Sequence, residues 1–380
     1  MTAVSSSWWR VFWFCLVLFV LSHLFFIGTA ILVHNNLTSN MPYSALFSLI
    51  DGYWYMDIAQ HGYDVHARAA SFYGHQNYVF FPLYPLVIKG VMLLTGLKVL
   101  WAGQLVSQVC FFTALCLFYR WMERGWGVET AQISSLLLAF SPYNIYFMAI
   151  YTDALFLLLF LLFWIAAQRR QWWAVGVCGF CMSLTHPNGV LVFLFALWFA
   201  WDDLKSRRVA RPRVILANAG IQSNQLLPYA PILLIPLGLL GFMAYLHLHV
   251  GDALAFVHNE RAAWHRDGWH LAALPRHLAR QTAGDSYNVS MYGLALALSG
   301  FLWLRGCRKE AFVIPVFTVM GLLSGSFVAL ARYSACLFPF YIALGLFVVE
   351  KRGLKIILAA EIIGSILLMY CWIEQAIPAF

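Results

Sequence analysis

This sequence carries little charge for its length. Only 11% of its 380 residues are charged, whereas 62% are hydrophobic and 17% are aromatic. A soluble globular chain usually has about 25% charged residues, which its surface needs. The composition therefore excludes an ordinary soluble domain and indicates a protein whose helices cross a membrane several times.

Negative charge is scarcer still, because 16 acidic residues stand against 24 Lys and Arg, for a formal net charge of +8. Such an excess can indicate nucleic-acid binding when the basic residues form one continuous face. Here they fall in small clusters between apolar runs, for example around Arg120, around Arg169 and across 205–213. We therefore expect no nucleic-acid partner and interpret the clusters as topology signals.

A disulfide framework is also missing. The cysteines lie in apolar segments, except for Cys307, which follows Arg305 in a polar loop. Cys178 and Cys181 form a CxxC, but small packing residues in a helix explain this pair better than a redox or metal site.

Apolar runs recur along the whole chain, and each is close to one membrane span of about 20 residues. They predict an all-α polytopic membrane protein with about 11 transmembrane helices in a single integral-membrane domain, residues 1–380. The stretch 172–201 could instead be one long, broken helix. The candidate spans are 11–33, 101–119, 131–149, 153–168, 172–184, 188–201, 226–247, 289–304, 311–330, 333–349 and 356–373.

The basic clusters fit a topology with the N-terminus inside, provided that 80–97 lies along the outer interface as a helix and does not cross. This topology predicts two long outward loops, 34–100 and 248–288, and a cytoplasmic basic loop, 202–225. The second outward loop can form further interfacial helices. Half of the acidic residues and most of the histidines then face outward, where a site is expected.

The host and membrane are indicated only weakly. Residues 213–225, RVILANAGIQSNQ, resemble a short translated repeat found in some bacterial genomes. We therefore expect a bacterial inner membrane, with the site facing the periplasm. The glycosylation sequons at Asn36 and Asn288 leave an endoplasmic-reticulum membrane with a luminal site open.

The stretch SLIDGYWYMDIAQHGYD, residues 48–64, concentrates acidic residues beside an apolar run. If it is helical, Asp51 and Tyr55 share one face, while Asp57 and His61 pair on another. Asp51 could belong to a site, although on the residues alone an Asp at this position is more often a helix cap. His61 could hold Asp57 or a substrate hydroxyl, or simply be a solvated loop residue.

Three further positions combine polar side chains with apolar surroundings. Arg332 lies between two apolar spans, where an unpaired guanidinium is costly, unless it reaches the outer interface. Asp153 either caps the helix that follows it or belongs to a site. His186 and Asn188 flank a proline between two apolar segments, and form either a donor-rich break or the polar tip of a hairpin.

A divalent metal is possible but is not expected. Asp51, Asp57, His61, His66 and His75 carry suitable ligand atoms on the outward side, but no spacing among them is diagnostic of a metal site. We expect no cofactor.

Five segments, in order, resemble the motif series of the PIG-V family of GPI mannosyltransferases and its bacterial relatives, which are GT-C glycosyltransferases. The segments are DGYWYMDIAQHGY (51–63), FFPLYP (80–85), SPYNIYFMAIYTDALF (141–156), LTHPNGVLV (184–192) and ARYSACLFPF (331–340). The sequence departs from the family pattern in three places. Ile50 replaces the usual Trp, Asp153 the common Glu, and His186 the usual Arg.

The resemblance implies a GT-C-like helical bundle that transfers a sugar, with mannose favoured, from a polyprenyl-phosphate donor to an acceptor hydroxyl on the outward side. The donor lipid would be dolichyl or undecaprenyl phosphate, and the acceptor a glycolipid, a glycan or a protein. The reaction would be an inverting single displacement. A transporter or a flippase of lipid-linked sugars is the alternative, although the sequence shows no convincing internal repeat and its polar motifs lie toward one membrane face.

The chemistry assigns a role to each candidate. Asp51 would take the proton of the acceptor hydroxyl, and Asp153 would assist it. Arg332, with Tyr333 beside it, would hold the leaving phosphate. The remaining candidates for substrate binding are His186, Asn188, Tyr55, Asp57 and His61.

Overall fold

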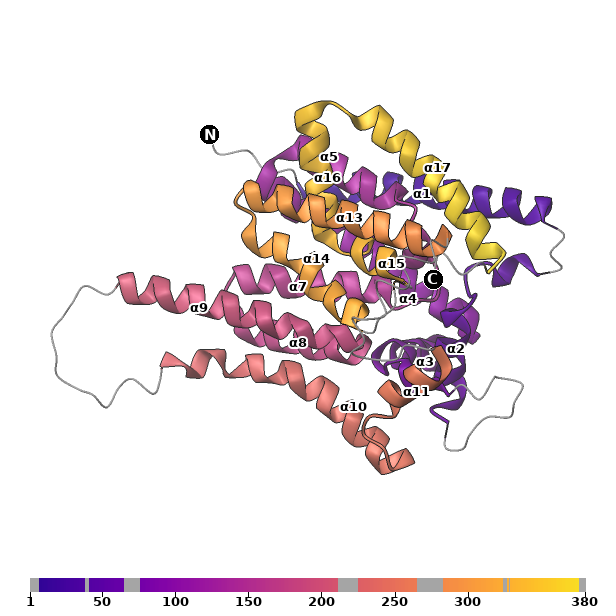
Figure 1. Ribbon diagram of the computed structural model, residues 1–380, viewed down its shortest axis with the longest axis horizontal. Coiled ribbons are helices and arrows are strands. Elements are labelled where there is room, and N and C mark those ends of the chain that lie inside the picture. The colour runs from indigo at the N-terminus through magenta and orange to yellow at the C-terminus, as the bar shows by residue number, and fades with distance from the viewer. Residues whose placement is uncertain are drawn as a thin grey trace.

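The computed structural model describes residues 7–37, 41–64, 76–210, 225–264, 283–323, 327 and 329–375, and within these ranges every regular element is a helix (Figure 1). The fold class predicted from the sequence is therefore confirmed as an all-helical membrane protein. The longer helices are α1 (Trp8–Asn36), α4 (Val99–Trp126), α5 (Val128–Phe140), α7 (Asp153–Gln168), α8 (Trp172–Thr185), α9 (Val192–Ala210), α10 (Leu234–Val250), α13 (Ala283–Leu304), α14 (Arg308–Leu323), α16 (Phe338–Lys351) and α17 (Leu354–Ile373). The shorter ones are α2 (Asp51–His61), α3 (Leu83–Thr95), α6 (Asn144–Met148), α11 (Ala255–Trp264) and α15 (Leu330–Ala335).

Five helical segments of the described residues are long and apolar enough to cross a membrane. They are Trp8–Asn36, Val99–Trp126, Leu227–Val250, Ser286–Leu304 and Leu354–Ile373. Each of the other predicted spans also contains a helix, but a shorter or more broken one. The number of crossings therefore stays a prediction. Helix α3 has 13 residues, about 20 Å of helix, which is too short to span about 30 Å of hydrocarbon.

Three predicted boundaries were wrong. The span expected over 131–149 stops at Phe140, because Pro142 cannot continue the backbone hydrogen bonds of α5. The Ser141 hydroxyl accepts the Tyr143 N–H there, at 3.2 Å. The span expected over 333–349 is divided between α15 and α16. Helix α9 continues to Ala210, past the predicted end of its span at residue 201, and the cytoplasmic location of 202–225 stays a prediction.

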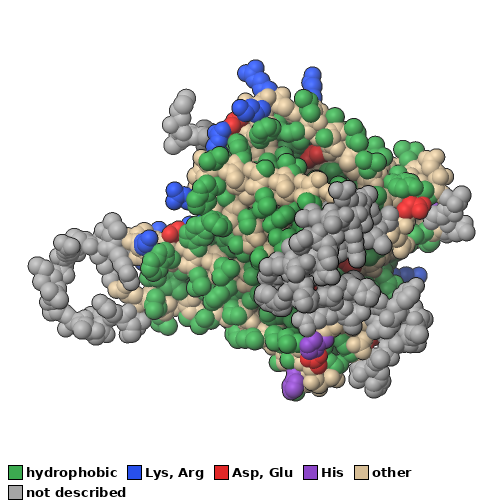
Figure 2. Space-filling model, viewed as in Figure 1, with side chains coloured by type: hydrophobic (Ala, Val, Ile, Leu, Met, Phe, Trp, Pro, Cys, Tyr) green, Lys and Arg blue, Asp and Glu red, His purple; other side chains and the backbone are tan. Residues whose placement is uncertain are grey.

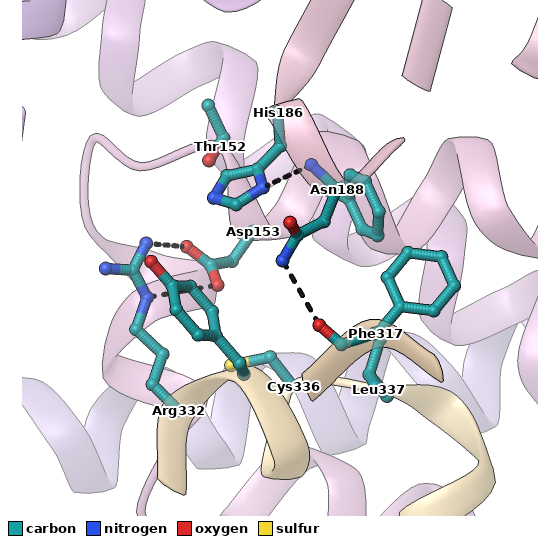
Figure 3. Close-up of a pocket in the computed structure, with 10 residues that line it drawn as sticks. Thr152, Asp153, His186, Asn188, Phe317, Arg332, Cys336 and Leu337 are labelled. Carbon is teal, nitrogen blue, oxygen red and sulfur yellow. Dashed lines mark hydrogen bonds and ion pairs between the residues drawn. The ribbon is translucent and has the colours of Figure 1, made fainter. Parts of the chain in front are cut away.

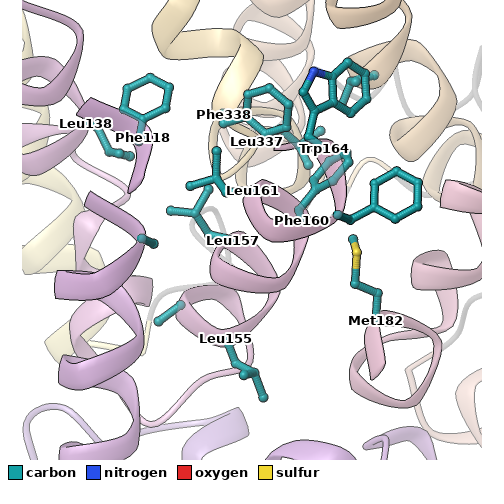
Figure 4. Packing of buried hydrophobic residues seen from close by; sticks show 14 of the residues in the cluster. Phe118, Leu138, Leu155, Leu157, Phe160, Leu161, Trp164, Met182, Leu337 and Phe338 are labelled. Atoms are coloured by element: carbon teal, nitrogen blue, oxygen red, sulfur yellow. The ribbon is translucent and has the colours of Figure 1, made fainter. Parts of the chain in front are cut away.

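Helix α7 lies at the centre of the bundle and is buried on nearly all sides. It packs against α4, α8 and α9, and Phe160 and Trp164 meet Phe338 of α16 (Figure 4). A helix that is apolar all round is typical of a core position. Asp153 is the first residue of α7, so its backbone is anchored in a well-packed helix.

The short helices α2, α3 and α11 gather at one end of the bundle (Figure 1). There Phe81 packs against Phe242 of α10 and Phe256 of α11. The two predicted outward loops thus contact each other, although residues 65–75 and 265–282 lie outside the described part. In Figure 2, most of the visible Lys and Arg side chains lie away from this end. This separation fits the positive-inside topology, whose orientation stays a prediction.

Close packing of α8 against the turn before α10 generates a stability prediction. A Cβ built on Gly176 would lie 2.1 Å from the carbonyl oxygen of Pro231, so Gly176→Ala must force two backbones apart. We expect a loss of about 1–3 kcal/mol, seen as a lower apparent melting temperature in detergent. Gly300→Ala is the matched control, because nothing lies within 4 Å of its Cβ position. Equal melting temperatures for the two variants would contradict this packing.

Candidate active site

Three ionised side chains from distant parts of the sequence meet where α2, α7 and α15 converge. The guanidinium of Arg332 donates to Asp153 through Nε (3.3 Å to Oδ1) and Nη2 (2.7 Å to Oδ2). Its third nitrogen, Nη1, donates to Oδ2 of Asp51 at 3.2 Å. Figure 3 shows Arg332 and Asp153 pointing toward one another beside the cavity. The two-pronged contact with Asp153 is the geometry in which Arg–carboxylate pairs are strongest. We call this group the Asp–Arg–Asp cluster.

The cluster is buried unevenly. The side chain of Arg332 is 8% exposed and that of Asp153 10%, whereas that of Asp51 is 25% exposed. Burial disfavours the charged guanidinium, and the carboxylates of Asp153 and Asp51 compensate its charge. With one cation and two carboxylates, the cluster has an excess of negative charge. Asp51 is the carboxylate that solutes can reach.

Two tyrosines support the cation. The rings of Tyr146 and Tyr151 each lie 4.7 Å from the guanidinium carbon of Arg332, and Tyr333 lies 5.9 Å away. Aromatic faces attract a guanidinium, more strongly where water is excluded. These tyrosines therefore fix the plane in which Arg332 presents its donors.

A cavity of about 40 Å³ opens beside the cluster. His186 and Asn188 line it together with Asp153, Arg332 and Tyr333. A space of this size admits a few water molecules.

His186 and Asn188 are held in place by the break between α8 and α9. Nδ1 of His186 accepts the Asn188 N–H at 3.2 Å, and the Asn188 side chain donates to the carbonyl oxygen of Phe317 at 3.2 Å (Figure 3). The His186 ring packs edge-on against Tyr333, 5.5 Å between centroids. The polar break predicted at these residues thus opens onto the same cavity as Arg332.

Three predicted substrate-binding residues do not line this cavity. Tyr55 is buried one helical turn after Asp51, in edge-on contact with Phe80 and Tyr84. The Asp57 carboxylate pairs with His61 at 3.0 Å and accepts from Asn77 at 3.5 Å. These contacts fix the chain that follows α2. Asp57 and His61 share one face of the helix, as the sequence predicted. Their role in binding stays a prediction.

No group of three or more potential metal ligands occurs among the residues that the structure describes. His66 and His75 lie outside the described residues, so the structure does not test whether they bind a metal.

Sequence reasoning missed Tyr146 and Tyr151 as parts of the site. Both lie in SPYNIYFMAIYTDALF, close before Asp153. Their position next to a candidate site residue could have indicated that they belong to the site. Tyrosines near span ends are commonly interface anchors, which is why composition alone did not single them out.

The buried cluster makes a testable prediction about stability. Arg332→Leu leaves Asp51 and Asp153 facing each other without their cation, and we expect a loss of about 3–5 kcal/mol. Asp153→Asn should cost more than Asp51→Asn, because Asp153 has two bonds to Arg332 and is less exposed. The measurement is denaturant unfolding in detergent. Arg305→Leu, which removes an exposed pair with Glu350, is the control and should cost at most about 1 kcal/mol. Equal losses for Arg332→Leu and Arg305→Leu would contradict the arrangement.

One comparison with known proteins found a match. Residues 81–222 match the family model of the dolichyl-phosphate-mannose-protein mannosyltransferases. The matched range runs from α3 into the segment after α9 and contains Asp153, His186 and Asn188, but neither Asp51 nor Arg332. No curated protein is significantly similar to this chain. The match covers less than half of the sequence and supports a membrane glycosyltransferase of the GT-C type.

Proposed function

We propose that this protein transfers mannose from a polyprenyl-phosphate donor to an acceptor hydroxyl, by an inverting single displacement on the outward side of the membrane. The observation that carries the proposal is the Asp–Arg–Asp cluster, in which a buried cation and a reachable carboxylate lie side by side. The PIG-V-like motifs support mannose as the sugar and a polyprenyl phosphate as its carrier.

The reaction needs little more than these groups. The bond between the sugar C1 and the phosphate oxygen breaks while a bond from the acceptor oxygen to C1 forms. The phosphate departs as a stable anion, so no general acid is required, but its charge needs a cation. Arg332 is the cation that meets this charge. Asp51 takes the proton from the acceptor hydroxyl as the new bond forms.

The two carboxylates are suited to different roles. Asp153 holds two nitrogens of Arg332 and begins the central helix, so it orients the cation. Asp51 holds one nitrogen at 3.2 Å and is the more exposed of the two. When a donor phosphate binds Arg332, it displaces the weaker contact, which is the one with Asp51. Asp51 is then free to act as a base.

The resemblance to the PIG-V family supports the substrates by class. The donor is dolichyl or undecaprenyl phosphate-linked, with its lipid chain among membrane lipids. The acceptor is a hydroxyl of a glycolipid, a glycan or a protein. The site faces the periplasm of a bacterial inner membrane, with the lumen of the endoplasmic reticulum as the alternative.

A transfer assay tests the proposal. Membranes containing the protein are incubated with radiolabelled polyprenyl-phosphate-mannose and host lipids, and label leaving the donor is followed. We expect transfer by the wild type and a loss of about 100-fold or more in Asp51→Asn, with donor binding unchanged. Arg332→Lys should weaken both binding and transfer, because Lys cannot replace the planar fork.

Asp202→Asn is the control. Asp202 lies on α9 and pairs with Lys309 of α14, outside the cluster, so this variant should transfer normally. Donor that crosses the membrane without being consumed would instead favour a flippase. Wild-type membranes that neither consume nor move the donor would contradict the proposed donor.

A further inference from the structure

The residue before Asp51 has a strained backbone. Ile50 has φ 56° and ψ −109°, and the Gly52 N–H donates to the Leu49 carbonyl at 3.1 Å, which closes a four-residue turn around it. These angles are close to those of the first central residue in a type II′ turn, a position that glycine dominates. A β-branched residue with positive φ is an outlier. Such a conformation persists only where the surrounding structure enforces it.

The hydroxyl of Tyr151 bridges this turn. Its oxygen accepts the Asp51 N–H at 3.1 Å, and it donates to the Leu49 carbonyl at 3.4 Å, so one atom holds both neighbours of Ile50. Tyr151 is fully buried. The adjacent Ile150 N–H donates to the carbonyl of Phe47 at 2.9 Å, which keeps the two segments side by side.

The ring of the same tyrosine reaches the cation. It lies 4.7 Å from the guanidinium carbon of Arg332 and packs against Trp372 at 5.4 Å. The Trp372 indole N–H in turn donates to the carbonyl of Leu46 at 2.6 Å, just before the turn. Tyr151 therefore contacts the backbone of Asp51 through its oxygen and the side chain of Arg332 through its ring.

We infer that Tyr151 is a positioning residue, whose hydroxyl holds the strained start of α2 and so places the carboxylate of Asp51 beside Arg332. This role rests on the proposed function as far as its effect on transfer is concerned. Tyr151 takes no proton in the reaction, because its own hydroxyl proton is directed at the Leu49 carbonyl. Without the hydroxyl, the turn at Ile50 relaxes and the carboxylate of Asp51 moves away from Arg332.

The strain at Ile50 offers a way to separate positioning from other roles. Tyr151→Phe keeps the ring against Arg332 and removes only the oxygen. We expect its kcat to fall by roughly 10- to 100-fold, while the KM for the donor changes by less than about twofold. Ile50→Gly can adopt the same turn without strain. Combined with Tyr151→Phe, it should therefore restore kcat to within about threefold of Ile50→Gly alone.

Tyr341→Phe is the matched control. Tyr341 is also fully buried, and its hydroxyl makes one hydrogen bond, to Ser141 at 2.7 Å, away from the cluster. It should keep the wild-type kcat. If Tyr151→Phe also keeps it, or if Ile50→Gly rescues nothing, the positioning role is overturned.

Amide hydrogen exchange of the peptide over 47–55 separates this inference from the proposed function. Exchange should be slow in the wild type, faster in Tyr151→Phe and unchanged in Tyr341→Phe. If the wild type transfers no sugar but exchange follows this order, the proposed function fails and the bridge at Ile50 stands. If exchange in Tyr151→Phe equals that of the wild type, the bridge itself is refuted, whatever the activity.

Discussion

Arg332 is almost fully buried, and a guanidinium removed from water is tolerated only where anions and hydrogen-bond acceptors compensate its charge. Asp153 and Asp51 provide this compensation from two other helices. Because each carboxylate is the first residue of its helix, the starts of α2 and α7 must lie where Arg332 can reach them. This electrostatic requirement ties residues from three parts of the sequence to one place.

The packing of α7 and α2 positions the two carboxylates beside Arg332. Helix α7 is packed on nearly all sides, so Asp153 has little freedom. Helix α2 is short and follows a strained turn, which Tyr151 attaches to the segment before α7. A buried carboxylate beside a more exposed one is a suitable arrangement for a site in which one acid orients a cation and the other handles a proton.

The sequence was informative about residues and much less so about contacts. Hydropathy located a helix in each predicted span, because apolar length is a local property. Helical periodicity correctly separated the face of Asp51 from that of Asp57 and His61. The ordered motifs named Asp51, Asp153 and Arg332, but nothing in them says that one guanidinium lies between the two carboxylates. The tyrosines that hold the cation were missed, since their role depends on packing between distant segments. The end of α5 at Phe140 was missed although Pro142 marks it, because the apolar run continues beyond the proline.

The central claim is that the Asp–Arg–Asp cluster receives the phosphate of a polyprenyl donor. Electron cryomicroscopy of the protein in lipid nanodiscs with added polyprenyl phosphate tests this most directly. The account predicts phosphate density within about 3 Å of the guanidinium nitrogens, with Asp153 still paired to Arg332 and Asp51 released from it. Phosphate density bound elsewhere, with Arg332 still held by both carboxylates, would contradict it.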